Sequence, residues 1–262
     1  DPSETMPSNG SISYLYGNMT TFPGIIKPAD FIASDVADEQ FKVFKDKYDI
    51  RYYENIEKVS SSIYGIGKYS NISIYVTSSN ADIKTMGTRH TESNCYAPWV
   101  IYRTADVMLM KAEALTQMVS NDPQTEEAKA QNDSLLKAAY EIVNVIEKRS
   151  SIAGNYENIA YESYSSRNQM EELVLMERQR ELMFEGKRWF DLVRKARRDG
   201  KTNFLVNKVQ QKGSDNAGVV QSKLAKMDGL YWPYNNDELK VNGNLVQNPS
   251  YGSGSATTGS EK

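Results

Sequence analysis

The chain has 262 residues, which corresponds to one large domain or two small ones. Its formal net charge of −3, from 31 Lys and Arg against 34 Asp and Glu, argues against a nucleic-acid-binding protein. The single cysteine, Cys95, cannot form an internal disulfide, and the single histidine, His90, excludes a multi-histidine metal site. The 17 tyrosines stand out, and this side chain suits half-exposed binding faces because its ring is apolar and its tip is polar.

The first hundred residues are predicted to form loops and short strands. Prolines and glycines interrupt residues 1–30, and one short helix is expected within residues 30–48. Residues 63–76 are rich in β-branched and aromatic side chains, which predicts one or two strands. Residues 77–94 are polar and predict a surface loop. His90 lies in this loop without a nucleophile motif, which favours a solvated histidine over a catalytic base.

Apolar residues at helical spacing predict two helices, over residues 101–119 and 126–149. The expected apolar faces consist of Ile101, Ala105, Met108, Ala112, Leu115 and Val119, and of Ala128, Leu135, Ala139, Ile142 and Ile146. Either Asp122 or Thr125 can cap the second helix. The short connector predicts an antiparallel helical hairpin of the tetratricopeptide kind, whose apolar face needs a further partner.

A third helix is predicted over residues 169–199, with Asn168 and Glu171 as a capping box at its start. Cationic residues crowd its last turn and Gly200 ends it. Gly186 in mid-helix is interpreted as a close helix contact. We expect this helix to lie against the hairpin. From residue 252 onward the chain is rich in Gly, Ser and Thr and is expected to be disordered.

Two acids of the third helix, Glu181 and Glu185, invite a catalytic interpretation. Paired carboxylates can act as the acid and base of a hydrolase. Each acid, however, has cationic neighbours at helical spacing, which favours a helix laced with ion pairs. No catalytic residue, metal ligand or cofactor site is therefore predicted.

Three segments together resemble the SusD/RagB family, the surface nutrient-binding lipoproteins of Bacteroidetes outer membranes. They are YRTADVMLMKAEAL at 102–115, ERQRELMFEGKRWFDL at 177–192, and YWP at 231–233 with NLVQNPSY at 244–251. The resemblance covers about residues 100–251, and it departs from the family pattern at Asn235 and Ser250. It implies a mainly α fold, with a tetratricopeptide-type hairpin, long loops and a few short strands.

The resemblance also implies an organisation for the whole protein. Residues 1–98 would form a loop-rich variable region, residues 99–251 the C-terminal helical region of the family, and residues 252–262 a disordered tail. Family members are about twice as long, so the chain is interpreted as the C-terminal part of such a protein or as a short relative. The lipid-bearing N-terminal cysteine would lie outside this chain, and Cys95 is not that anchor.

The implied function is non-catalytic capture of glycans or oligosaccharides at the outward face of the outer membrane, for a SusC-like TonB-dependent barrel transporter. Aromatic side chains in loops would stack on sugar rings, and the candidates are Tyr14, Tyr16, Tyr52, Tyr53, Tyr64 and Trp99. Partial core burial is at least as good an explanation for each of them. Trp189 and Trp232 lie inside the motifs and are assigned to packing. Two alternatives stay open, namely peptides or another nutrient on the same scaffold, and a carboxylate-based glycosidase.

Overall fold

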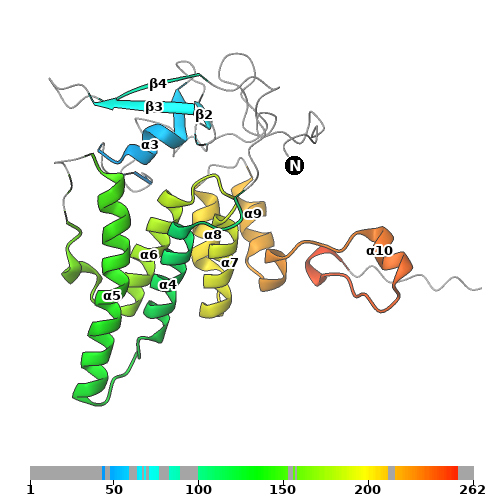
Figure 1. Ribbon diagram of the computed structural model, residues 1–262. Coiled ribbons are helices and arrows are strands. Elements are labelled where there is room, and N and C mark those ends of the chain that lie inside the picture. Colours follow the sequence, from blue (N-terminus) through cyan, green and yellow to red (C-terminus); the bar gives the residue numbers. More distant parts are fainter. Residues whose placement is uncertain are drawn as a thin grey trace, which may run out of the picture. The chain divides into compact units, whose positions relative to one another are not determined.

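The computed structural model describes residues 43–44, 48–58, 64–66, 68, 71–76, 83–88, 100–152, 156, 158–211 and 216–252. The chain divides into two compact units, Asp1–Arg188 and Trp189–Lys262. Helices dominate the described part of each unit, which confirms the predicted mainly α fold (Figure 1). The predicted boundaries at residues 98 and 251 stay predictions.

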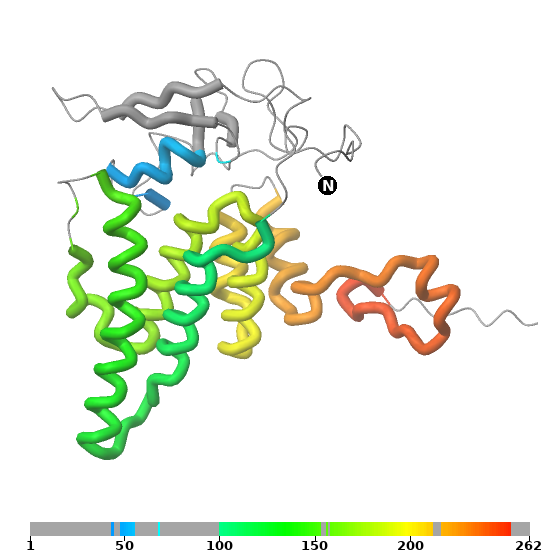
Figure 2. Tube along the Cα trace, in the orientation of Figure 1, coloured from blue at the N-terminus to red at the C-terminus, as the bar shows by residue number. Residues whose placement is uncertain are grey.

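The helical hairpin of the first unit has the predicted form. Helix α4 (Thr104–Met118) and helix α5 (Glu126–Ser150) run antiparallel, and helix α6 (Arg167–Glu181) packs against both (Figure 2). Of the two possible caps for α5, the chain uses Thr125, whose hydroxyl oxygen accepts a hydrogen bond from the backbone N–H of Ala128 at 3.1 Å. A 3₁₀ helix, η4 (Tyr161–Tyr164), precedes α6.

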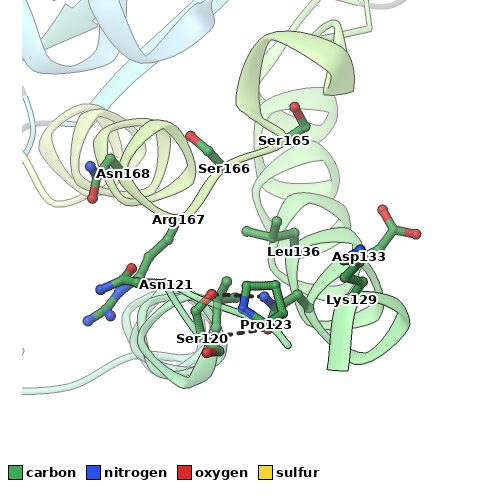
Figure 3. A pocket seen from close by; sticks show the side chains of 12 residues that line it. Ser120, Asn121, Pro123, Lys129, Asp133, Leu136, Ser165, Ser166, Arg167 and Asn168 are labelled. Atoms are coloured by element: carbon green, nitrogen blue, oxygen red, sulfur yellow. Dashed lines mark hydrogen bonds between the residues drawn. The ribbon is translucent and has the colours of Figure 1, made fainter. Parts of the chain in front are cut away.

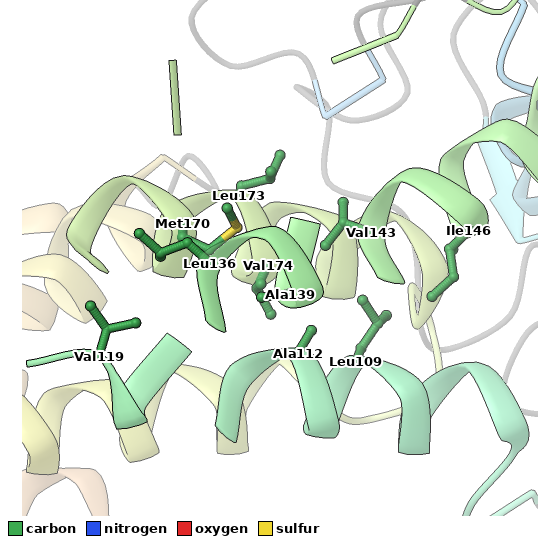
Figure 4. Packing of buried hydrophobic residues seen from close by; sticks show 10 residues of the cluster. All are labelled: Leu109, Ala112, Val119, Leu136, Ala139, Val143, Ile146, Met170, Leu173 and Val174. Atoms are coloured by element: carbon green, nitrogen blue, oxygen red, sulfur yellow. The ribbon is translucent and has the colours of Figure 1, made fainter. Parts of the chain in front are cut away.

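The core between these three helices consists of aliphatic side chains (Figure 4). It contains Leu109, Ala112 and Val119 from α4 and the residue after it, Leu136, Ala139, Val143 and Ile146 from α5, and Met170, Leu173 and Val174 from α6. The expected faces are therefore rotated slightly, because Met108, Leu115, Leu135 and Ile142 are only partly buried beside this core. Ile101 precedes α4 and is 66% exposed.

The predicted third helix over residues 169–199 is wrong in its middle. Helix α6 ends at Glu181, and α7 (Arg188–Asp199) begins after a turn. Within the turn Phe184 has φ 63° and Gly186 has φ 73°, conformations that a helix cannot contain. Gly186 therefore serves the turn and is not a helix contact. The first half of the prediction, that α6 lies against the hairpin, is confirmed.

The start of α6 also differs from the prediction. Ser166, not Asn168, is the N-cap, and its hydroxyl oxygen accepts from the backbone N–H of Gln169 at 3.4 Å. Ser166 and Gln169 stand three residues apart, which is the spacing of a capping box. Asn168 lies two residues after the cap, as the second residue of the helix, and therefore cannot serve as its cap.

The described N-terminal part contains one short helix and two antiparallel strand pairs. Helix α3 (Ile50–Asn55) leads into β1 (Ile56–Lys58), which pairs with β2 (Tyr64–Ile66). Strand β3 (Asn71–Val76) pairs with β4 (Ile83–Thr88), with Val76 opposite Ile83. The predicted strands within residues 63–76 are confirmed.

The sequence prediction missed β4, which lies in the expected surface loop over residues 77–94. The polar and glycine residues of β4 interrupt the run of β-branched and aromatic side chains by which a strand is recognised in sequence. The backbone of β4 instead forms its strand by pairing with β3. His90 lies outside the described residues, as does almost all of the helix expected within residues 30–48.

The second unit contains α7, α8 (Asn203–Gln210), α9 (Ala217–Leu224), η5 (Met227–Leu230), α10 (Asn236–Val241) and η6 (Pro249–Tyr251). Leu192, Ala196 and Leu205 form its core with Leu230. Trp189 packs against this cluster, as expected. Helix α7 ends before Gly200, whose φ of 67° confirms its predicted role at the helix end.

The assignment of Trp232 to packing is wrong, because this side chain is 86% exposed. Hydrogen bonds between side-chain amides and backbone groups fix the segment around Trp232 instead. The Gln247 amide donates to the Tyr234 carbonyl and accepts from the Tyr234 N–H, both at 3.0 Å. The Asn248 amide donates to the carbonyl oxygens of Asp228 at 2.8 Å and Tyr231 at 3.0 Å. The segment is thus fixed without burial of the indole ring.

The buried core gives a stability prediction. Leu109 is fully buried, and its replacement by Ala should lower the free energy of unfolding by about 2–5 kcal/mol through lost burial and cavity formation. Val107, 53% exposed on the same helix, is the matched control, and Val107→Ala should change stability by less than about 0.5 kcal/mol. Urea denaturation followed by circular dichroism measures both, and equal effects would contradict this core.

Candidate functional site

The structure describes the side chains of two of the six predicted ligand-binding residues. Tyr52 and Tyr53 are consecutive in α3. Tyr64 is the first residue of β2. Tyr14, Tyr16 and Trp99 lie outside the described residues.

The two tyrosines of α3 form part of a small aromatic cluster. The Tyr52 and Tyr53 rings meet edge to face with centroids 5.2 Å apart, and Phe44 meets Tyr52 at 5.9 Å. Both tyrosines are half-buried. Tyr52 also packs with the cluster around Met183 and Phe184, so at least part of its role is packing. Among the described residues, the members of that cluster do not include Tyr53, whose ring contacts Tyr52.

A network of buried charges surrounds the end of α6. Its centre is Glu181, whose side chain is only 3% exposed. Three arginines from three other segments contact its carboxylate. Arg51 of α3 lies at 3.1 Å, Arg103 at the N-cap of α4 at 2.5 Å, and Arg149 at the end of α5 at 2.6 Å. The last residue of α6 therefore joins the other helices of the first unit.

Two further acids complete this network. Glu177, one turn before Glu181, contacts Arg51 at 2.6 Å and Arg180 at 2.6 Å. Glu185 lies in the turn after α6 and contacts Arg103 at 2.8 Å and Lys68 at 2.6 Å. The turn that contains Phe184 and Gly186 thus holds Glu185 beside the same cationic group that Glu181 contacts.

A separate ion-pair group joins α4 to the same turn. Asp106 is buried, and it contacts Arg178 of α6 at 3.0 Å and Lys187 at 3.3 Å. Lys187 also donates to the Ile101 carbonyl oxygen. The two longest motifs of the sequence, 102–115 and 177–192, are therefore held together by buried charges.

These contacts confirm that Glu181 and Glu185 take part in ion pairs, but the partners differ from those expected. The sequence pattern indicated cations on the same helix, whereas Arg51, Lys68, Arg103 and Arg149 come from elsewhere in the chain. Burial raises the pKa of Glu181, and hydrogen bonds from Arg149 and Arg103 outweigh this, so the pKa falls to about 2. A carboxyl group that is ionised at neutral pH cannot donate a proton as a general acid.

Glu147 of α5 has the opposite electrostatic character. Burial raises its pKa to about 6, although Arg180 at 3.3 Å lowers it again in part. One of its carboxylate oxygens, Oε2, is buried without a hydrogen-bond partner. The ionised form of Glu147 is therefore destabilised at neutral pH, because one of its carboxylate oxygens is buried without a compensating hydrogen bond.

Neither a metal centre nor a membrane span is found in the part of the chain that the structure describes. No group of three or more His, Cys, Asp or Glu there could hold a metal ion. No described helix is both long and apolar enough to cross a bilayer.

Comparison with known proteins identifies the family. The chain matches the SusD family over residues 18–251 and belongs to it. It is similar to SusD-like protein P38 of Formosa agariphila, with 27% identity over 209 residues, which are 78% of this chain and 32% of that protein. The chain thus spans about a third of the length of the curated relative that it matches. No solved structure matches the chain significantly.

The low pKa of Glu181 predicts acid sensitivity. An acid whose pKa is lower in the folded state stabilises the fold fully above its unfolded pKa of 4.5, and this contribution disappears as the pH falls towards 2. The shift corresponds to roughly 3 kcal/mol. We expect Glu181→Gln to destabilise the protein at pH 7 and to flatten the decline of stability below pH 4.5.

Urea denaturation at a series of pH values measures this effect. Glu172→Gln, at an exposed position of the same helix, is the matched control and should keep the wild-type profile. A Glu181→Gln profile parallel to that of the wild type would contradict the role of this carboxylate.

Glu147 predicts an effect of the opposite sign. Because its folded pKa is raised, the ionised form costs stability above pH 6, and protonation removes this cost as the pH falls to 4.5. Glu147→Gln should therefore raise the free energy of unfolding at pH 7, by up to about 2 kcal/mol. Glu141→Gln, exposed on the same helix, should leave it unchanged. A destabilised Glu147→Gln variant would show that its bond to Arg180 outweighs its burial.

Proposed function

We propose that the chain is part of a surface nutrient-binding component of a SusC/SusD-type uptake system. In this role it captures glycans or oligosaccharides at the outward face of the outer membrane and passes them to a TonB-dependent barrel transporter. The protein would be anchored by a lipid on an N-terminal cysteine outside this chain. The observation that carries this function is the match to the SusD family over residues 18–251.

The charge network supports a binding role without catalysis. A carboxylate-based glycosidase needs one protonated and one ionised carboxyl group facing a cleft. Glu181 and Glu185 are both buried, and each contacts at least two cations. Their side chains are committed to joining the segments of the first unit. The motif that contains them therefore serves the scaffold.

The aromatic candidates remain part of this proposal. Tyr14, Tyr16, Tyr52, Tyr53, Tyr64 and Trp99 are the side chains proposed to stack on sugar rings. Within the pair that α3 presents, Tyr53 is the better candidate, since Tyr52 packs with the cluster around Met183. An edge-to-face neighbour would hold the Tyr53 ring in a fixed orientation for stacking.

Binding and turnover are tested on the same protein sample. The full chain is applied to an array of neutral, uronic-acid-containing and sulfated oligosaccharides beside a peptide library, and release of reducing sugar is measured from every glycan. We expect saturable glycan binding, no peptide binding and no sugar release. Tyr53→Ala should weaken binding, whereas Tyr140→Ala, a tyrosine packed beside the helical core, controls for the loss of a phenol ring.

Three results would overturn the proposal. Peptide binding without glycan binding would assign the scaffold to another nutrient. Sugar release that disappears in Glu181→Gln or Glu147→Gln would identify an enzyme. Binding to neither class would reject nutrient capture by this chain.

A further inference from the structure

A surface pocket lies where the connection between α4 and α5 meets the start of α6 (Figure 3). Its volume is about 340 Å³, at the lower end of the range for small-molecule sites. Three segments line it, namely residues 119–123, the first turns of α5, and residues 165–168. All three belong to the first unit.

Hydrogen bonds within the protein fix the walls of the pocket. The Asn132 amide donates to the Ser120 carbonyl oxygen at 2.8 Å and accepts from the Ser120 N–H at 2.9 Å, which fixes the connection. On the opposite wall, the Arg167 guanidinium donates to Gln117 Oε1 at 2.6 Å. The connection and the opposite wall are therefore already ordered before a ligand binds, which lowers the entropic cost of binding.

The floor of the pocket is apolar and its rim is polar. Val119 and Leu136 are buried beneath it, and Pro123 is half-buried at its side. On the rim, Asn121 and Asn168 are exposed. Within the described part of the chain, neither amide side chain hydrogen-bonds to the protein. Each amide thus offers two N–H donors and a carbonyl acceptor to a ligand.

Two of the three charged side chains at the rim have an ion-pair partner. Lys129 contacts Glu126 at 2.7 Å, and Asp133 contacts Lys137 at 2.8 Å. The third, Arg167, donates to the neutral Gln117 side chain and has no acidic partner among the described residues. An anion would have to compete with Glu126 for Lys129 but not for Arg167, so phosphate is the competing ligand that the test includes. Free amides above an apolar floor fit a neutral ligand that carries several hydroxyl groups.

We propose that this pocket binds a neutral sugar, either a monosaccharide or one end of an oligosaccharide. The C–H face of the ring would lie on Val119, Leu136 and Pro123. Vicinal hydroxyl groups, which both donate and accept, would pair with the amides of Asn121 and Asn168. The choice of sugars as the ligand class rests on the function proposed above. The site is separate from the predicted aromatic residues, and no aromatic side chain is among its described lining.

Nuclear magnetic resonance of the ¹⁵N-labelled full chain tests this site. The probes are the methyl glycosides of glucose, galactose and xylose, with maltose and cellobiose as disaccharides and inorganic phosphate as the anion. We expect saturable shifts of the Asn121 and Asn168 side-chain amide signals with at least one sugar, at a dissociation constant on the order of 1 mM, and no such shifts with phosphate.

Variants connect these shifts to the pocket. Asn121→Ala and Asn168→Ala should each weaken binding about tenfold, the effect of losing one good hydrogen bond, with unchanged melting temperatures. Gln131→Ala removes an exposed amide of α5 outside the pocket lining and should bind as the wild type does. Shifts with phosphate alone, sugar binding unaffected by both asparagine variants, or no shift with any sugar would each overturn the proposed site.

The array and the titration fail independently of each other. Glycan binding on the array without shifts at Asn121 and Asn168 rejects this pocket and leaves the proposed function intact. Saturable shifts at the pocket without binding of any arrayed glycan retain the pocket as a sugar site and reject nutrient capture as the function.

Discussion

Burial of the Glu181 carboxylate is the constraint on which the first unit depends. A buried charge is costly unless opposite charges and hydrogen bonds compensate it. The compensation here comes from Arg51, Arg103 and Arg149, which belong to α3, the start of α4 and the end of α5. A single side chain therefore requires three segments to meet the end of α6. If one of them is displaced, the buried carboxylate loses part of the compensation for its charge.

The same constraint explains the form of the longest motifs. Arg103 and Asp106 in the first of them find their partners in the second, where Arg178, Glu181 and Glu185 lie. Such motifs describe how the helices are joined and do not describe a ligand. The scaffold can then remain unchanged while other surfaces acquire different ligands.

The hairpin could be predicted from the sequence because its apolar residues follow the helical period over many turns. The exact register could not, because Met108 and Leu109 are both apolar and only the position of α6 decides which of them is fully buried. The end of the helix at Glu181 could not be predicted from the sequence either. Long-range pairing of Glu185 with Arg103 and Lys68 accompanies the unusual conformations of Phe184 and Gly186, and no local pattern carries that information.

Candidate site residues were harder to predict than helices. The abundance of Tyr indicated aromatic stacking, yet a half-buried ring such as Tyr52 is equally a packing residue. The pocket at the α4–α5 connection was missed altogether. Its asparagines stand in ordinary turn sequences, and only the fold brings Asn121 near Asn168.

The charge network also has a consequence for the order in which the chain folds. Arg149 and Glu181 are 32 residues apart in sequence, whereas Arg51 and Glu181 are 130 apart. Loop closure favours the nearer pairing, so α4, α5 and α6 can assemble around their aliphatic core before α3 arrives. We expect docking of Arg51 to follow the transition state in this order of events. Interactions formed after the transition state slow unfolding without accelerating folding, so α3 would then help to determine how long the folded unit persists.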